Sequence, residues 1–222
     1  TVLEYVVTIK TAFEMNGIKK DDITGSIISS VVPAVTNTVK TAVEKYLSIT
    51  PLIIGPGIKT GLSIMIDNPS QLGSDLVVDA VAGISEYPAP LIIIDMGTAT
   101  TVGVVDENKT FIGGMIVPGV MVSLNALAGG TAQLPHISLD PPKHAIGRNT
   151  VECMQNGIIY HNAAGVDGMI ERMEAELGSK TTVIATGGIA KFVLPMCRHE
   201  IRYDKDLLVK GLAALYRDNK RG

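Results

Sequence analysis

The chain has 222 residues, which allows one or two domains and a sizeable hydrophobic core. Hydrophobic residues make up 46% of it and aromatic residues only 4%, with no tryptophan, so the core must be mainly aliphatic. The formal net charge is −3 and no run of five like charges occurs, which argues against a nucleic-acid-binding protein, because such proteins usually carry a basic patch.

Cysteine usage and hydropathy favour a cytoplasmic protein without a membrane segment. Cys153 and Cys197 are the only cysteines and lie far apart, which fits a reducing compartment better than a disulfide scaffold. The first residues show no signal-peptide pattern. Residues 110–139 contain no Asp, Glu, Lys or Arg, but Pro118, Asn125 and several glycines interrupt them. We therefore expect a strand, a turn and a buried helix there, not a membrane span.

The first half of the chain predicts helices that alternate with short strands. Thr1 and Glu4 have the spacing of a capping box, so the first helix is expected to run to about Met15 and to end at Asn16 and Gly17. The elements expected after it are a strand over 23–30, a helix over 34–46, a strand over 52–54, a loop over 55–69 and a helix over 70–84.

The second half opens with three consecutive strands. An apolar run over 91–94 leads to Asp95, and a turn of small residues joins it to a second apolar run that ends at 105. The elements expected after this hairpin are a strand over 111–117, a helix over 119–128, a polar loop, a helix from Asn149 or Thr150 to about Leu177, a strand over 183–185, a helix, a strand over 201–203 and a helix from Asp206 to about Tyr216.

The hairpin turn carries the groups that a polyphosphate needs. Gly97 can adopt a positive φ and expose its N–H, while Thr98, Thr100 and Thr101 add hydroxyl donors. Asp95, at the strand end, can hold a cation that neutralises phosphate charge. The alternative is an ordinary β-hairpin with a β-branched second strand.

The order of elements suggests an internal duplication. The first half reads α-β-α-β-α, and the second reads β-β-β-α-loop-α-β-α-β-α. The first half therefore matches the later part of the second and lacks its three opening strands. We expect two related domains, over residues 1–88 and 89–222, with an unpaired sheet edge and exposed apolar surface in the first.

Eight short motifs, in the same order, resemble those of the type III pantothenate kinases. The family belongs to the actin-like ATPase superfamily, so the resemblance implies an α/β fold with duplicated ribonuclease H-like domains, of which the first copy lacks its opening strands. The motifs are residues 29–33 (SSVVP), 57–62 (GIKTGL), 67–69 (DNP), 73–75 (GSD), 95–101 (DMGTATT), Gly113-Gly114 with Pro118-Gly119, 147–150 (GRNT) and 186–188 (TGG).

The resemblance implies transfer of the γ-phosphate of ATP to pantothenate, the first step of coenzyme A biosynthesis. Asp95 would bind the monovalent cation, potassium or ammonium, and magnesium would accompany the nucleotide. Thr98 would contact ATP. The segment of Thr186, Gly187 and Gly188 would line the adenosine side, although a plain strand-to-helix turn is the alternative.

The resemblance also implies the pantothenate site. Asp75 would be the base that accepts the hydroxyl proton, and Thr150 would contact pantothenate in a site shared by a homodimer. Taken alone, Asp75 could equally be a helix N-cap, and Thr150 is expected to be a cap as well as a ligand contact, since one hydroxyl can do both. The other positions expected at this site are Gly73, Ser74, Leu76 and Ile66.

Three departures from the family pattern keep a second function open. Leu76 stands where the family has an arginine for pantothenate, and Lys59 or Arg148 would have to supply that charge. Ile66 stands where many members have tyrosine, and the first phosphate loop, Asp-x-Gly-Asn-Thr, is not found. The alternative is a non-catalytic relative that binds a nucleotide or an acidic metabolite and has a regulatory role. In either case the uncharged stretch over 115–128 predicts a homodimer.

Overall fold

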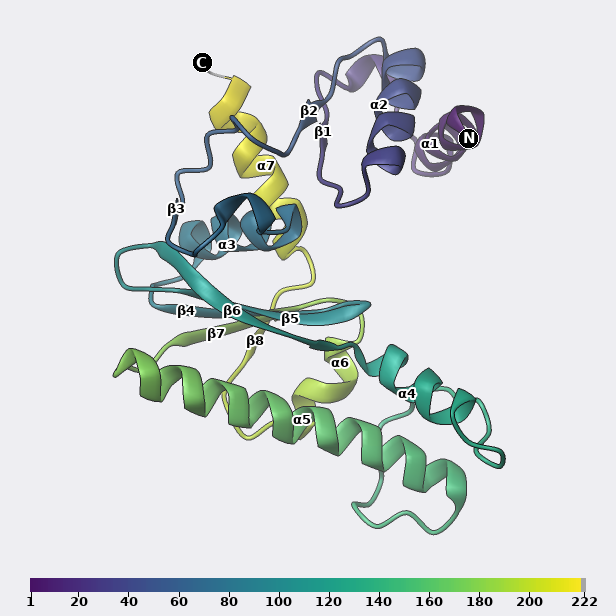
Figure 1. Cartoon of the computed structure of the whole chain (residues 1–222). Helices are drawn as coiled ribbons and strands as arrows, with labels where there is room; N and C mark the ends of the chain where they lie inside the picture. The colour runs from purple at the N-terminus through teal and green to yellow at the C-terminus, as the bar shows by residue number, and fades with distance from the viewer. Residues whose placement is uncertain (221–222) are drawn as a thin grey trace. The chain divides into compact units, whose positions relative to one another are not determined.

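The computed structural model describes residues 1–220 (Figure 1) and divides into two compact units. Unit 1 contains Thr1–Gly61, Asn68–Ala82 and the chain from Leu208 onward, and unit 2 contains Leu62–Asp67 and Gly83–Leu207. These units are defined by which residues pack together. The predicted domains, residues 1–88 and 89–222, are defined instead as two copies of a duplicated fold, and they stay a prediction.

Unit 2 is built on a six-stranded mixed sheet. β4 is paired with β5 in antiparallel and with β7 in parallel orientation. The near-continuous apolar run of β4 suits a strand that is buried on both faces. The spatial order is β3 (Ser63–Ile64), β6 (Thr110–Pro118), β5 (Ala99–Val105), β4 (Leu91–Met96), β7 (Thr182–Thr186) and β8 (Arg202–Tyr203).

One face of this sheet is covered by α5 (Thr150–Leu177) and the short α6 (Ala190–Val193), and α4 (Val120–Gly129) packs beside α5 (Figure 1). Alternate residues of β4 reach this face, and Ile92 and Ile94 belong to the core that α5 completes. The remaining β4 residues face the other way, where Ile93 packs against Gly83. The core is aliphatic, as the composition predicts.

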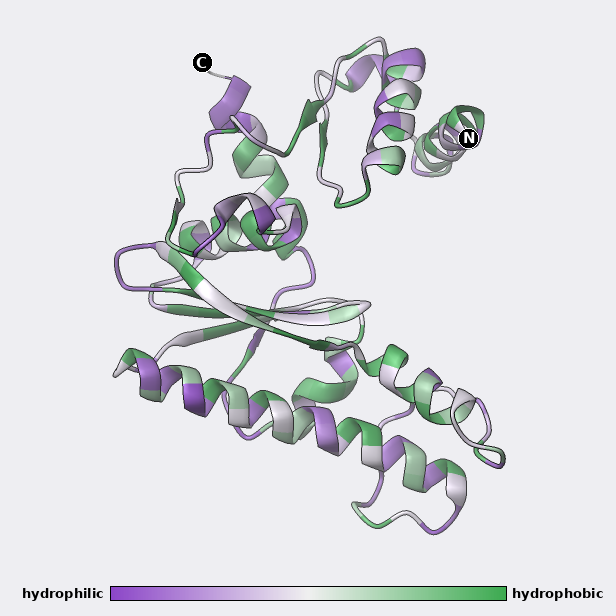
Figure 2. Cartoon of the chain, viewed as in Figure 1, coloured by the Kyte–Doolittle hydropathy of each residue, from purple (hydrophilic) through white to green (hydrophobic). Residues whose placement is uncertain are grey.

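The long helix α5 follows from local sequence signals. Asn149 caps its start by accepting a hydrogen bond from the backbone N–H of Glu152 at 2.9 Å, and Gly178 ends it in a left-handed conformation. Its buried stripe recurs every three or four residues, and Figure 2 shows hydrophobic and hydrophilic residues alternating around the helix. The stripe includes Ile159, Ala163, Val166, Ile170 and Met173.

Unit 1 is smaller and less buried. The capping box at Thr1 and Glu4 is confirmed, and α1 packs against α2 with the rings of Phe13 and Tyr46 edge to face, 6.0 Å apart. No residue of α1 is fully buried. The elements of this unit are α1 (Val2–Met15), β1 (Ile27–Ile28), α2 (Pro33–Leu47), β2 (Leu52–Ile53), most of α3 (Ser74–Glu86) and most of α7 (Leu207–Lys220).

Three predicted segments differ from the structure. The strand predicted over 23–30 shrinks to β1, because only two of its residues pair with β2. The loop predicted over 55–69 contains β3, which pairs in parallel with the start of β6. The helix predicted from residue 70 begins at Ser74, because Pro69–Gln71 form a 3₁₀ turn and Leu72 is extended.

Residues 110–139 form β6, α4 and the start of a loop, in agreement with the predicted strand, turn and helix. Within residues 1–220, no helix has both the length and the hydropathy of a membrane span.

Candidate active site

The β4–β5 turn, formed by Gly97 and Thr98, is the first component of the candidate site. It is tight, since the N–H of Gly97 donates to the carbonyl of Ala99 at 3.0 Å. Both turn residues are exposed, and Asp95 just before them is half-buried. The predicted positive φ and exposed N–H of Gly97 are therefore wrong, because its φ is not positive and its N–H is bonded within the turn. The turn presents the Thr98 hydroxyl at one edge of the sheet, with the Asp95 carboxylate just before it.

The threonines of β5 do not all face this edge. Thr101 lies directly opposite Asp95 across the β4–β5 ladder, so their side chains share one face of the sheet. Thr100 is opposite Met96 on the other face and is only 3% exposed. Because side chains alternate along a strand, the structure groups Thr101 with Asp95 and separates Thr100 from both.

The glycine loop, formed by Thr186, Gly187 and Gly188, is the second component. Since β7 runs parallel to β4 with Thr186 beside Asp95, both strands end at the same edge. Gly187 has φ +92°, and a Cβ there would lie 2.5 Å from the carbonyl oxygen of Met96 and 2.8 Å from Oδ1 of Asp95. Only glycine fits this position. Ligands of open α/β sheets bind at such carboxyl ends of strands.

Gly119 is a third component, and it lies in a motif that was not assigned to the site from the sequence. It precedes the first turn of α4, and a Cβ there would lie 2.1 Å from the carbonyl oxygen of Thr98. The start of α4 therefore lies against the β4–β5 turn, and helix N-termini favour anions. The signal in the sequence was the Pro118-Gly119 pair, which marks the point where β6 ends and a helix begins.

The predicted catalytic segment lies in unit 1. Asp75 is the second residue of α3, so the alternative that it is the N-cap is wrong. Its Oδ1 accepts the backbone N–H of Leu76 at 2.9 Å. The hydroxyl of Ser29 donates to that of Ser74 at 2.8 Å, which joins two motifs that lie 45 residues apart. Gly73 packs against this segment, since a Cβ there would meet the Asp75 carboxylate.

The predicted pantothenate contacts Thr150 and Ile66 both lie in unit 2. Thr150 is exposed and is the first residue of α5; Asn149 provides the cap, so the alternative of a Thr150 cap is wrong. Ile66 is half-buried and follows β3. Thr150 borders a groove of about 410 Å³ between α4 and α5, whose other lining residues are Leu127, Leu134, Cys153, Met154, Gly157, Ile158 and His161.

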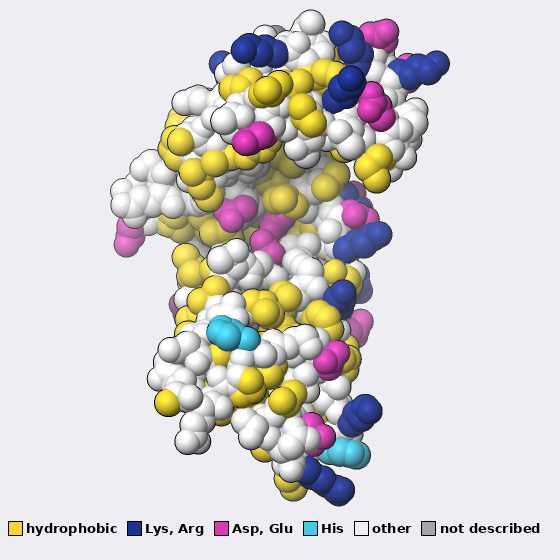
Figure 3. Space-filling view, turned by 90° about the vertical axis from the view of Figure 1, so that its right-hand side faces the viewer, with side chains coloured by type: hydrophobic (Ala, Val, Ile, Leu, Met, Phe, Trp, Pro, Cys, Tyr) yellow, Lys and Arg dark blue, Asp and Glu magenta, His cyan; other side chains and the backbone are white. Residues whose placement is uncertain are grey.

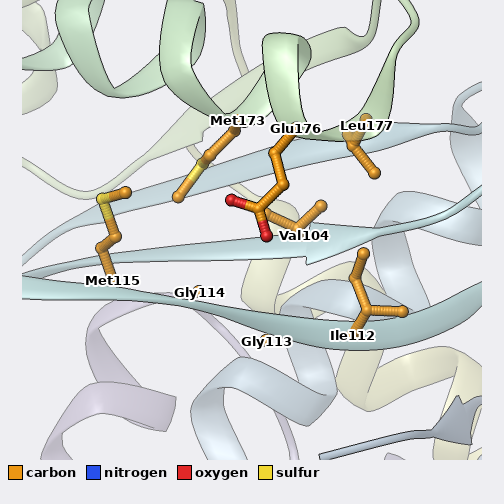
Figure 4. Close-up of a pocket in the computed structure, with 8 residues that line it drawn as sticks. All are labelled: Val104, Ile112, Gly113, Gly114, Met115, Met173, Glu176 and Leu177. Atoms are coloured by element: carbon orange, nitrogen blue, oxygen red, sulfur yellow. The ribbon is translucent and has the colours of Figure 1, made fainter.

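A second cavity, of about 150 Å³, lies apart from these groups (Figure 4). Met115 of β6 and Met173 of α5 point into it, and Glu176 is its one charged side chain. It lies where Val104 pairs with Gly113, toward the opposite end of β5 from the turn. With mainly apolar walls it offers little to a phosphate, so we do not include it in the candidate site.

The sheet topology and the glycine-lined edge define an α/β protein with a candidate anion-binding site at the carboxyl ends of its central strands. A protein-family model described as type III pantothenate kinase matches residues 1–172. The chain belongs to the type III pantothenate kinase family. These kinases use ATP to phosphorylate pantothenate in coenzyme A biosynthesis, and their superfamily is that of the actin-like ATPases.

Two curated relatives carry the name of this family. The protein from Halalkalibacterium halodurans is 44% identical over 216 residues, covering 97% of this chain and 85% of its own length. That from Bacillus cytotoxicus is 45% identical over 216 residues, covering 97% and 82%. The predicted family and enzyme class are thereby confirmed.

A similar solved structure is that of a conserved Baf family protein from Campylobacter jejuni, whose name calls it a transcriptional activator. Its TM-score is 0.62 at 17% identity, with 91% of this chain and 87% of that chain covered. At this identity the likeness shows the fold alone. No finding supports the alternative of a non-catalytic regulatory relative.

Proposed function

We propose that the β4–β5 turn and the glycine loop together hold the phosphates of ATP during phosphoryl transfer to pantothenate. The observation that carries this proposal is the convergence of Asp95 and Gly187, two groups separated by 92 positions in the sequence, at one edge of the sheet. Phosphoryl transfer depends mainly on alignment and charge stabilisation, which backbone N–H groups and a bound cation supply. Thr98 contributes a hydroxyl donor from the turn, and Thr101 lies on the same face as Asp95.

Asp95 is the proposed ligand of a monovalent cation, potassium or ammonium. The carbonyl oxygen of Met96 and Oδ1 of Asp95 both lie close to Gly187, so two oxygen atoms converge at this edge of the sheet. Hard cations prefer oxygen ligands, and a single carboxylate suits a single positive charge. Among residues 1–220, no three His, Cys, Asp or Glu side chains are grouped to hold a metal. Magnesium would arrive with the nucleotide, because Mg²⁺ in such sites is bound largely by substrate phosphates.

Asp75 is the proposed general base. It lies in the first turn of α3, where its Oδ1 accepts the backbone N–H of Leu76. We propose that Gly73, Ser74 and Leu76, its neighbours in unit 1, contact pantothenate beside it. Ile66 and Thr150 are the proposed pantothenate contacts of unit 2, where Thr150 borders the groove between α4 and α5.

Of Arg148 and Lys59, Arg148 is the stronger candidate for the positive charge that Leu76 does not supply. It lies two residues before Thr150, at the start of α5. Lys59 instead belongs to unit 1, where its backbone exchanges two hydrogen bonds with the side chain of Asn219. A cation near Thr150 would attract the carboxylate of pantothenate, as would the N-terminus of α5.

A homodimer is the proposed assembly, formed through an α4–α5 patch. This patch comprises four exposed apolar side chains, and Figure 3 shows hydrophobic side chains on the lower part of the molecule, where α4 and the start of α5 lie. Thr150 lies beside the patch, which supports a pantothenate site that two copies share. The four side chains are Val122, Leu127, Ile146 and Val151.

The duplicated ribonuclease H-like architecture is also a proposal. In unit 1, α1-β1-α2-β2-α3 repeats the order α5-β7-α6-β8-α7, and the strands of each pair are parallel. The free thiols of Cys153 and Cys197 are consistent with a cytoplasmic location. The net charge of −3 favours small substrates over nucleic acid or an anionic membrane surface.

The proposal is tested by measuring pantothenate phosphorylation with potassium, ammonium or sodium as the only monovalent cation. We expect potassium and ammonium to support turnover, and sodium to depress it. Asp95→Asn should abolish this cation dependence and weaken ATP binding, whereas Glu107→Gln, at an exposed position in the turn between β5 and β6, should behave as wild type. If turnover of the wild type and of Asp95→Asn is the same with each cation, the proposed cation site is refuted.

A further inference from the structure

Tyr203 makes a contact with the glycine loop that the proposed function does not use. It is the last residue of β8, which lies beside β7 in parallel orientation, with Tyr203 paired to Ala185. Its phenol donates a hydrogen bond to the carbonyl oxygen of Gly187 at 3.3 Å. The side chain is 44% exposed, so this contact forms at the rim of the sheet and not in the core.

This contact constrains the orientation of a whole peptide group. The carbonyl of Gly187 and the N–H of Gly188 belong to one planar trans peptide and point in opposite directions. A donor that holds the carbonyl therefore also fixes the direction of the N–H. Glycine has the largest conformational freedom of any residue, so a loop of two glycines gains most from such a tether. The backbone N–H of Ala190 also donates a hydrogen bond to this carbonyl oxygen, at 3.3 Å.

The surroundings of Gly188 are open. Gly188 is exposed, and a Cβ there would meet no atom within 4 Å. Gly187 instead is pressed against Met96 and Asp95. The loop thus has one glycine fixed by close approach to the β4–β5 turn and a second that faces open space.

We propose that Tyr203 is a positioning residue for the nucleotide. By holding the carbonyl of Gly187, its hydroxyl presents the N–H of Gly188 to the bound nucleotide. This inference rests on the proposed function, in which the glycine loop binds ATP. It adds a residue that lies beyond the region matched by the family model, which ends at residue 172.

The test is calorimetric titration of the full chain with a non-hydrolysable ATP analogue. Tyr203→Phe removes the hydroxyl and keeps the ring, and we expect the dissociation constant to rise about three- to tenfold, the loss typical of one neutral hydrogen bond. Pantothenate affinity and the melting temperature should stay unchanged. Tyr160→Phe, on α5 in the same unit, is the matched control and should bind the analogue as wild type does.

Two results would overturn the inference. Nucleotide affinity of Tyr203→Phe equal to that of Tyr160→Phe would show that the hydroxyl does not act on binding. A lower melting temperature with equal losses for both substrates would show a merely structural role. If the glycine loop and the β4–β5 turn do not bind ATP at all, the result differs: Thr98→Val will then leave nucleotide affinity unchanged.

Discussion

Asp75 is held at the start of α3 with one carboxylate oxygen bonded to the N–H of Leu76, which leaves its second oxygen for a substrate proton. If it is the base, Asp75→Asn should lower kcat by about 10²- to 10⁴-fold, the usual contribution of general base catalysis. The amide can still accept the N–H of Leu76, so nucleotide affinity should change little. Steady-state kinetics together with nucleotide titration measure both quantities.

Asp22→Asn is the matched control for this prediction. Asp22 is an exposed carboxylate in a 3₁₀ turn of the same unit, and its loss should leave kcat within about twofold of wild type, as is usual for surface substitutions. Near-normal turnover by Asp75→Asn would remove Asp75 from the mechanism.

Leu76 follows the proposed base and cannot donate a hydrogen bond from its side chain. A hydrogen bond between a charged donor and the carboxylate of pantothenate contributes about 1.5–3 kcal/mol, or roughly ten- to a hundredfold in affinity. Leu76→Arg should therefore tighten pantothenate binding, as measured by calorimetry. No gain would contradict this prediction and indicate that another cation already serves the carboxylate. In that case Arg148→Gln, but not Lys59→Gln, should weaken binding.

Among the elements of unit 2, α5 is linked to the segment before β8 by hydrogen bonds to Asp167. Its carboxylate accepts the backbone N–H groups of Arg198 and His199, and Nδ1 of His199 lies 2.9 Å from Oδ1. Burial acts to raise the pKa of Asp167, but these hydrogen bonds outweigh it and hold the pKa below its usual value. The half-buried Cys197, whose pKa is raised to about 12 by desolvation and by the Asp167 charge, stays a neutral thiol beside it.

This contact predicts a pH-dependent stability. Because the pKa of Asp167 is lower in the folded than in the unfolded protein, the carboxylate stabilises the fold above the unfolded pKa near 3.9, and this is lost as the pH falls through the folded value. Asp167→Asn should lower the free energy of unfolding by about 1–3 kcal/mol at pH 7, and by much less at a pH below the lowered pKa of Asp167 in the folded protein. Denaturant titrations at several pH values measure this. Equal losses at both pH values would contradict it, and exposed Glu171→Gln is the control.

Local signals predicted most elements, and long-range pairing explains the rest. The hairpin of β4 and β5 and the long α5 carry their periodicity and caps within the segment itself. The two residues of β3 form a strand only because β6 lies beside them, and no local pattern shows this. The contact of Gly119 with the β4–β5 turn depends equally on tertiary structure. The burial of Thr100 is predictable from the sequence, because side chains alternate along a strand and Thr100 must face away from Thr101.

At the scale of the whole molecule, the α4–α5 patch predicts a dimer. Val122→Glu would place a charge in the patch, and light scattering should then show a monomer where wild type is a dimer. Its pantothenate affinity should fall too, because Thr150 lies beside the patch. Val209→Glu places the same charge at a more exposed position on α7, and this protein should remain dimeric. A wild-type chain that is a monomer at all concentrations would contradict the shared site.

The proposed active site depends most on the binding of ATP phosphates by both the β4–β5 turn and the glycine loop. The most direct measurement is a crystal structure of the full chain with a non-hydrolysable ATP analogue, magnesium and potassium. We predict phosphate oxygens within hydrogen-bonding distance of Thr98 and the glycine loop, and potassium bound by the Asp95 carboxylate. A nucleotide bound elsewhere, with no phosphate at the glycine loop and no cation at Asp95, would contradict the proposed site.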